Sequence, residues 1–155
     1  MRLPLPRVST ERFGMAHAFG PQMARFLVVD DDPASVEGMT RLLHLDGHEV
    51  SPFTEGARAI DALAREPFDA IVTDLEMPKV DGTEVVRAAR QHAPGACLIV
   101  TTAKASAQHL YDAGACMLHE KPVEYDTLVD AVRECRARGG SDGGACHAPV
   151  SLRRR

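Results

Sequence analysis

The 155-residue chain lacks several features that would assign it to a special class of protein. It has no tryptophan and only two tyrosines, and no apolar run approaches the roughly 18 residues that cross a bilayer. The net charge of -4 argues against a surface that is basic throughout and holds nucleic acid. With 45% hydrophobic and 26% charged residues, the composition is that of a soluble globular protein. We therefore expect neither membrane insertion nor nucleic-acid binding.

Signals for export and for cysteine-based metal binding are also missing. Residues 1–21 hold three prolines and no continuous apolar stretch, so they lack the hydrophobic segment of a secretory signal. The four cysteines, Cys97, Cys116, Cys135 and Cys146, form no C-x-x-C pair, and no histidine is placed to complete a zinc set. We expect a cytoplasmic protein with reduced thiols, some of which fill the core.

The length of the chain is that of about one domain of roughly 150 residues. Ordered structure is expected over residues 25–138. Residues 1–24 are predicted to form a disordered extension, and residues 139–155, rich in glycine and ending in three arginines, a flexible tail. Because no room remains for an effector module after residue 138, the sequence predicts a protein with a single folded domain.

Short apolar runs alternate with amphipathic segments through the predicted domain. Strands are expected at 26–29, 49–53, 68–74, 96–101 and 116–121. Helices are expected at 33–45, 55–66, 83–93, 105–113 and 124–138. Pro52 places the second strand near a sheet edge, because proline cannot donate to a ladder. The alternation predicts an α/β fold, a small doubly wound parallel sheet with right-handed crossovers and helices on both faces.

The sequence also predicts two helix caps and the buried face of the last helix. Asp32 and Thr83 are candidate N-caps, since each precedes or opens a helical pattern with a side-chain oxygen. The inward face of the last helix is expected to hold Leu128, Val129, Val132 and Cys135.

Polar side chains from four different strands are expected at one edge of this sheet. They are Asp30, Asp31, Asp74, Thr101 and Lys121. The C-terminal ends of parallel strands share an edge, and ligands bind there. Three carboxylates within about 4 Å repel by roughly 4 kcal/mol per pair at an effective dielectric of 20, so the cluster needs a cation. Oxygen ligands with several retained waters favour Mg²⁺ over Ca²⁺.

The remaining groups fit phosphoryl transfer. The ammonium of Lys121 and the hydroxyl of Thr101 would hold the oxygens of a transferred phosphoryl group. Asp74, alone at the end of its strand and next to the metal, is the natural nucleophile for an aspartyl phosphate.

Four stretches of the sequence, LVVDDDP, VTDLEMPKVDG, LIVTTAK and AGACMLHEKP, resemble in order and spacing the motifs of the receiver domain of two-component response regulators. The resemblance covers residues 25–138. It implies a flavodoxin-like sheet of five parallel strands in the order 2-1-3-4-5. It also implies that Asp74 is the phosphoacceptor, that Asp31 and the backbone carbonyl of Glu76 bind Mg²⁺ directly, and that Asp30 acts through water.

The same resemblance implies a switch and a set of partners. Thr101 corresponds to the switch hydroxyl and Lys121 to the phosphate-contacting cation, and the Lys121-Pro122 bond is expected to be cis. A histidine kinase or histidine phosphotransfer protein would donate the phosphoryl group. A downstream protein would bind the surface made by the fourth helix, the fifth strand and the fifth helix. Signalling would then take place by phosphorylation-dependent protein binding.

Two departures from the family pattern keep other functions open. Leu118 stands where the family often has an aromatic switch residue, and the segment from Thr101 to Gly114 is about two residues shorter than is typical. One alternative is therefore a receiver-like interaction module that works without phosphorylation. Another is a Mg²⁺-dependent phosphohydrolase with an aspartyl phosphate, although Glu76 stands where such enzymes carry a second aspartate and no substrate cap is inserted.

Overall fold

The structure is a computed structural model, and it describes residues 23–103 and 109–139. The predicted extension and tail therefore lie outside the described residues, except at their inner ends. Ala24, counted with the extension from sequence, is buried, and its N–H donates to Nδ1 of His48 at 3.1 Å. The ordered chain thus begins before Arg25. Within the described ranges, no helix is long and apolar enough to cross a membrane.

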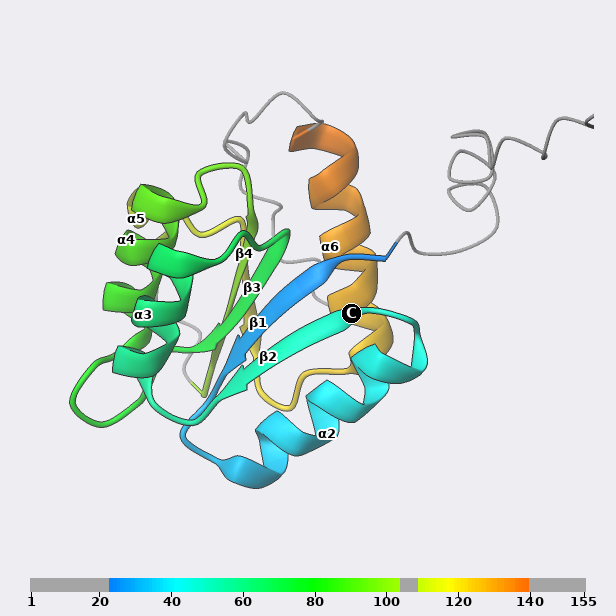
Figure 1. Cartoon of the computed structure of the whole chain (residues 1–155), viewed down its shortest axis with the longest axis horizontal. Coiled ribbons are helices and arrows are strands. Elements are labelled where there is room, and N and C mark those ends of the chain that lie inside the picture. Colours follow the sequence, from blue (N-terminus) through cyan, green and yellow to red (C-terminus); the bar gives the residue numbers. More distant parts are fainter. Residues whose placement is uncertain (1–22, 104–108, 140–155) are drawn as a thin grey trace, which may run out of the picture.

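Five parallel strands form one sheet in the order β2-β1-β3-β4-β5, which confirms the predicted fold class and strand order. The strands are β1 Arg25–Val29, β2 Glu49–Phe53, β3 Ala70–Asp74, β4 Cys97–Thr102 and β5 Met117–Glu120. Figure 1 shows the twisted sheet with β2 at one edge. β1, β3 and β4 are almost continuously buried, whereas β2, which contains Pro52, is partly exposed.

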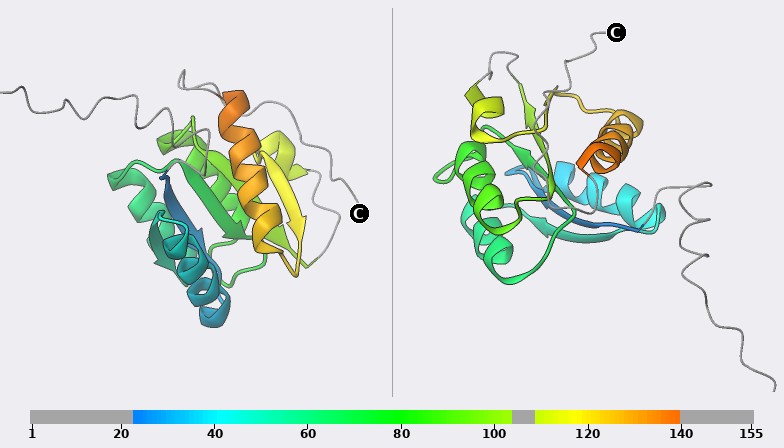
Figure 2. Two further views of the ribbon diagram at one scale, coloured as in Figure 1. Left: turned by 90° about the vertical axis from the view of Figure 1, so that its right-hand side faces the viewer. Right: turned by 90° about the horizontal axis from the view of Figure 1, so that it is seen from above.

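The helices lie in two layers, one on each face of the sheet (Figure 2). They are α2 Pro33–Leu45, α3 Gly56–Arg65, α4 Gly82–His92, α5 His109–Ala113 and α6 Tyr125–Gly139. α2 and α6 cover one face, and α3, α4 and α5 pack side by side on the other. The predicted helices are thus present within a few residues of their expected bounds, and α5 is described from His109 onward.

One predicted helix cap is confirmed and the other is wrong. The side chain of Asp32 accepts from the N–H of Ala34 and caps α2. α4 is capped by Asp81 rather than Thr83: the Asp81 carboxylate accepts from the N–H groups of Thr83 and Glu84, and Glu84 accepts from the Asp81 N–H. This reciprocal capping box satisfies more orphan donors than a threonine two positions later could.

The inward face of α6 also differs in one residue from the expected set. Leu128, Ala131, Val132 and Cys135 are buried, whereas Val129 is half-buried. Counted from Leu128, the other buried positions follow after three, four and seven residues, which places all four on one stripe of the helix. Val129 lies at the border of that stripe.

The expectation that all the cysteines are reduced is wrong for two of them. Cys97 and Cys135 form a disulfide bond across 38 residues of sequence. Sequence spacing could not reveal this pair, because only the crossover from β4 to α6 brings the two residues together. Cys116 is buried and is not disulfide-bonded, and Cys146 lies outside the described residues.

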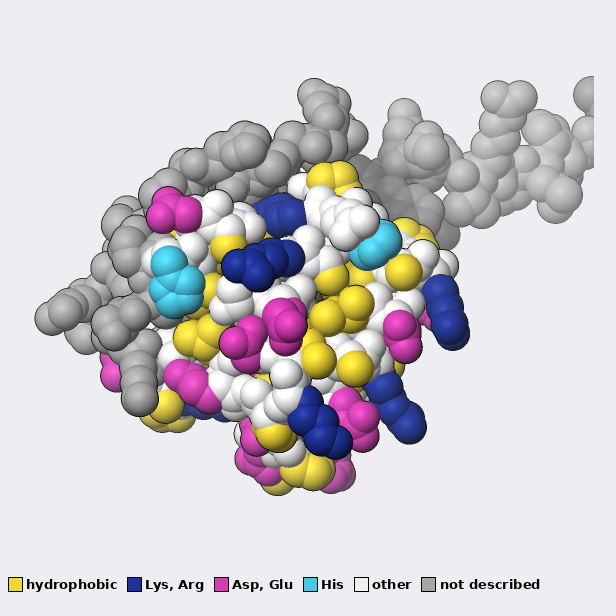
Figure 3. All heavy atoms as spheres, turned by 90° about the vertical axis from the view of Figure 1, so that its left-hand side faces the viewer, with side chains coloured by type: hydrophobic (Ala, Val, Ile, Leu, Met, Phe, Trp, Pro, Cys, Tyr) yellow, Lys and Arg dark blue, Asp and Glu magenta, His cyan; other side chains and the backbone are white. Residues whose placement is uncertain are grey.

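The surface that carries α3, α4 and α5 is shown in Figure 3. Basic and acidic side chains are interspersed there among small apolar areas. A mixed surface of this kind is that of an ordinary solvated face rather than of a phosphate-binding one.

Candidate functional site

The sheet topology brings three carboxylates together at the C-terminal edge of the strands. β1 and β3 pair in parallel with Val29 opposite Thr73, so the residues that follow them, Asp30 and Asp74, lie at the same level. One carboxylate oxygen each from Asp30, Asp31 and Asp74 lie within 4.8 Å of one another. Asp30 and Asp74 are buried and Asp31 is exposed, so the cluster opens to solvent on one side.

Lys121 supplies a positive charge to this cluster from the end of β5. Its Nζ lies 3.0 Å from Oδ2 of Asp30 and 3.2 Å from Oδ1 of Asp74. Burial lowers the pKa of Lys121, but its contacts with Asp30 and Asp74 together outweigh burial, so the net shift of the pKa is upward and the ammonium stays charged. The Lys121-Pro122 peptide bond is cis, as the resemblance implied. Three ionised carboxylates beside one ammonium carry a net negative charge, which a divalent cation would neutralise.

The electrostatics single out Asp74 among the three carboxylates. Its pKa is raised to about 6, first by burial and then by the neighbouring charge of Asp30, whereas Lys121 opposes the rise. A carboxylate that is costly to ionise in the folded protein gains most from a nearby cation.

This cost leads to a prediction on stability. A folded-state pKa raised from 3.8 to about 6 means that the folded protein holds this proton more tightly than the unfolded chain does. The free energy of unfolding therefore falls as the pH rises through this range and stays lower above it. With a chelator present, we expect Asp74→Asn to stabilise the protein by about 1–3 kcal/mol at about pH 8 and to change little at about pH 4. Urea unfolding at the two pH values measures this, and equal stability of the two proteins at the higher pH would contradict it.

The two threonines at the end of β4 take different hydrogen bonds. Thr101 lies opposite Asp74 in the sheet register, and its Oγ1 donates to the carbonyl of Thr73 at 3.5 Å. Oγ1 of Thr102 donates to Oε1 of Glu76 at 2.6 Å. The Ala103 N–H donates to Oε2 of the same carboxylate at 3.4 Å. Thr102 and Ala103 thus present two donors to the loop that follows Asp74.

Glu76 is held by these donors on the loop between β3 and α4. Burial raises its pKa, but the hydrogen bonds from Thr102 and Ala103 together with the charge of Lys121 outweigh burial, so the net shift of the pKa is downward and the carboxylate stays ionised. The role of the backbone carbonyl of Glu76 as a metal ligand stays a prediction. The sequence does hold a signal for the contact between Thr102 and Glu76, namely two adjacent threonines at the end of a strand. Successive strand residues point to opposite faces, so only one of the two hydroxyls can face the loop between β3 and α4.

Leu118, the residue that replaces the family's frequent aromatic, is buried on β5 opposite Val100. His119 next to it is half-buried, and burial lowers its pKa. A buried leucine therefore occupies the position at which the family often has an aromatic switch residue.

The strand order and the acidic edge together are those of the receiver class of α/β domains. The family model described as the response regulator receiver domain matches residues 26–133. The chain therefore belongs to the response regulator receiver domain family.

Curated relatives and solved structures agree with this assignment. The response regulator MprA of Mycolicibacterium vanbaalenii is 36% identical over 124 residues, which are 78% of this chain and 54% of the relative. The receiver domain protein (CheY-like) of Methanospirillum hungatei is 28% identical with a TM-score of 0.71 and covers 76% of this chain and 96% of that one. For the chemotaxis response regulator CheY4 of Vibrio cholerae the identity is 27%, the TM-score 0.68 and the coverage 73% and 98%. The chain spans about half the length of the curated relatives it matches.

Proposed function

We propose that the protein accepts a phosphoryl group on Asp74 and signals by phosphorylation-dependent binding of another protein. The observation that carries this proposal is the buried Asp74 carboxylate at the end of β3, within reach of both Lys121 and the acidic pair Asp30 and Asp31. In this proposal the protein catalyses no reaction other than the gain and loss of its own phosphoryl group. The phosphoryl donor would be a histidine kinase or a histidine phosphotransfer protein. The transfer would take place in the cytoplasm.

The cluster fits a Mg²⁺ ion. The donors are oxygens, their negative charge exceeds the single ammonium, and the exposed Asp31 leaves one side open to water. Asp31, Asp74 and the backbone carbonyl of Glu76 would hold the ion directly, and Asp30 through water. When bound, Mg²⁺ would neutralise carboxylate charge and stabilise the oxygens of the transferring phosphoryl group.

The residues of the chain have separate tasks in the transfer. A carboxylate oxygen of Asp74 attacks the phosphorus, the bond from phosphorus to the donor breaks, and the donor leaves with the electron pair. Lys121, already beside Asp74, pairs with the incoming phosphoryl oxygens. The hydroxyl of Thr102 and the N–H of Ala103 are the further hydrogen-bond donors. In the transfer they give up their hydrogen bonds to the Glu76 carboxylate and donate to the phosphoryl oxygens instead.

The output surface in this proposal consists of α5, β5 and α6, the elements named from sequence as the fourth helix, fifth strand and fifth helix. Movement of Thr102 toward the phosphoryl group would loosen the end of β4. β4 is hydrogen-bonded to β5, and the Lys121 N–H donates to the carbonyl of Thr102 at 2.8 Å. The phosphorylation state is thereby coupled to the strand at the centre of that surface.

Phosphorylation by acetyl phosphate with Mg²⁺, followed by intact mass, tests the function. We expect an adduct of roughly 80 Da, the mass of one phosphoryl group, in the wild type and none in Asp74→Asn. Asp32→Asn is the matched control, because Asp32 stands in the same acidic run but caps α2 and should leave the adduct intact. An adduct that persists in Asp74→Asn, or its absence from the wild type, would contradict the proposal, and turnover of varied phosphoesters would favour a phosphohydrolase.

A comparison of the two threonines tests the assignment of the hydroxyl. We expect Thr102→Ala to lower the rate of adduct formation about tenfold or more, since it removes a donor to developing charge. Thr101→Ala should have the smaller effect, because its hydroxyl donates to the Thr73 carbonyl. Initial rates of adduct formation by mass spectrometry measure both, and a larger loss in Thr101→Ala would return the role to that residue.

A further inference from the structure

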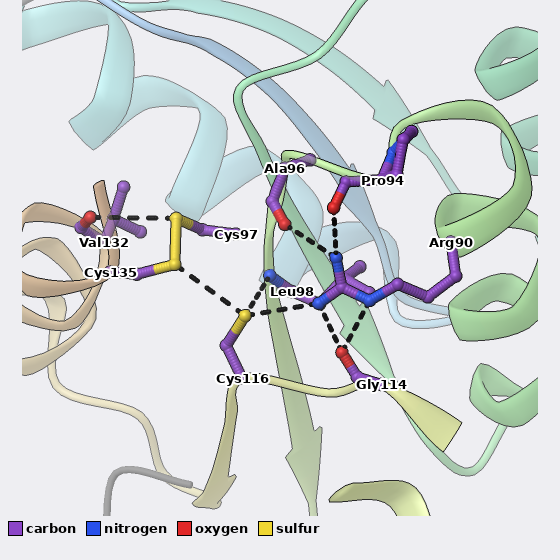
Figure 4. The surroundings of a disulfide bond; sticks show 9 residues. All are labelled: Arg90, Pro94, Ala96, Cys97, Leu98, Gly114, Cys116, Val132 and Cys135. Carbon is purple, nitrogen blue, oxygen red and sulfur yellow. Dashed lines mark hydrogen bonds between the residues drawn. A yellow bond between two sulfur atoms is a disulfide. The ribbon is translucent and has the colours of Figure 1, made fainter. Parts of the chain in front are cut away.

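Three cysteine sulfur atoms meet where β4, β5 and α6 approach one another (Figure 4). Cys97 opens β4, Cys116 immediately precedes β5, and Cys135 lies in α6. The Cys97–Cys135 disulfide is in place, and Sγ of Cys116 lies 3.7 Å from Sγ of Cys135. All three side chains are buried, with 2–4% of their surface exposed.

The Cys116 sulfur is held in this position by two further contacts. Nη2 of Arg90 donates to it at 3.3 Å, and the backbone N–H of Leu98 donates to it at 3.4 Å. Arg90 is itself fixed, because its guanidinium donates to the carbonyls of Pro94, Ala96 and Gly114. Figure 4 shows the guanidinium on one side of the Cys116 sulfur and the disulfide on the other. A fixed positive charge therefore faces the sulfur atom that contacts the disulfide.

We propose that Cys97, Cys116 and Cys135 form a thiol–disulfide exchange site in which Cys135 of α6 is shared between the other two cysteines. In the step, the thiolate of Cys116 attacks Sγ of Cys135, the Cys116–Cys135 bond forms and the Cys97–Cys135 bond breaks. Cys97 leaves as a thiolate and takes up the proton that Cys116 gave up. No atom or electron is gained or lost, so the exchange needs no external oxidant or reductant.

Geometry and charge both favour this exchange. The attacking sulfur is already in van der Waals contact with Cys135, so little movement of the chain is required. The guanidinium of Arg90 and the N–H of Leu98 stabilise negative charge on Cys116.

The exchange would change which part of the sheet holds α6. The Cys97–Cys135 bond ties α6 to β4, whereas the Cys116–Cys135 bond would tie it to the segment that enters β5. That segment is itself joined to β4, because the Cys116 N–H donates to the carbonyl of Leu98 at 2.8 Å. The two linkages would therefore anchor α6 at two neighbouring points of the same strand pair.

Disulfide mapping of the full chain tests the proposal. Cys146 is replaced by serine in every sample, so that only the three clustered cysteines can react. The protein is equilibrated in a glutathione buffer that leaves one disulfide per chain, quenched in acid to stop exchange, digested with pepsin and analysed by mass spectrometry. We expect two populations, linked Cys97–Cys135 and Cys116–Cys135. A single linkage, or none among the three, would overturn the proposal.

Two matched variants test which cysteine is shared. In Cys97→Ala we expect Cys116 and Cys135 to become linked, and in Cys116→Ala the Cys97–Cys135 bond should persist. A Cys97→Ala chain that unfolds cooperatively by circular dichroism yet keeps both remaining thiols reduced would contradict the assignment. The map of the chain that carries Cys146→Ser alone does not depend on these two variants, so it decides the question even if a replacement in the core prevents folding.

Discussion

We expect Gly82→Ala to lower the free energy of unfolding by about 2–3 kcal/mol. A Cβ at this position would lie 2.4 Å from the carbonyl oxygen of Asp74 and 2.7 Å from Cα of Leu75. Both contacts are with backbone, so no side chain can rotate away to relieve them. Either the start of α4 or the end of β3 must shift.

The same substitution should also impair phosphorylation. Gly82 lies against the backbone of Asp74, and its N–H donates to the carbonyl of Leu75 at 3.0 Å, so the strain falls on the phosphoacceptor itself. A displacement of about 1 Å is enough to cost about a hundredfold in a reaction that depends on orientation. We therefore expect the rate of adduct formation with acetyl phosphate to fall by about that factor while the chain still folds at low temperature.

Gly38→Ala is the matched control for this prediction. Gly38 is exposed within α2, and a Cβ there would meet nothing within 4 Å. Alanine should stabilise this helix by about 0.5–1 kcal/mol, because it has the higher helix propensity and loses less entropy on folding. Chemical denaturation of both variants gives the comparison. Equal stability of Gly82→Ala and the wild type would show that the β3–α4 connection is softer than its contacts indicate.

The sheet and its acidic edge could be predicted because they depend on local patterns. β1, β3 and β4 are apolar runs buried on both faces, and such runs predict parallel strands whose C-terminal residues share an edge. Asp74 ends a strand, and Asp30 and Lys121 each come directly after one, so strand order alone brings the three together.

The hydroxyl directions at the end of β4 and the disulfide bond could not be predicted, because they depend on orientation or on long-range contact. Thr101 and Thr102 are adjacent and chemically identical, and only the direction of each hydroxyl distinguishes them. The Cys97–Cys135 bond joins residues that are far apart in the chain, and it depends on how α6 packs over β4. The true cap of α4 could have been recognised, since Asp81 and Glu84 have the spacing of a capping box.

Lys121→Met should have opposite effects on two properties of the acidic cluster. Nζ of Lys121 is within 3.2 Å of both Asp30 and Asp74, so its positive charge competes with a metal ion for the same oxygens. Without the ammonium, the three carboxylates attract a divalent cation more strongly. At an effective dielectric of 20, two unit charges 4 Å apart interact by about 4 kcal/mol. Since solvent reaches the site, we expect a gain of about tenfold in Mg²⁺ affinity rather than the full effect.

The phosphoryl group should behave in the opposite way. Lys121 provides the fixed positive charge next to Asp74, and its loss leaves the phosphoryl oxygens without that partner, so we expect adduct formation to slow about a hundredfold. Calorimetric titration with Mg²⁺ at about pH 8, above the raised pKa of Asp74, and the acetyl phosphate assay measure the two effects. Lys79→Met removes an equal charge from an exposed position in the β3–α4 loop and should change neither property. Weaker Mg²⁺ binding in Lys121→Met would mean that Lys121 organises the carboxylates rather than competing with the metal for them.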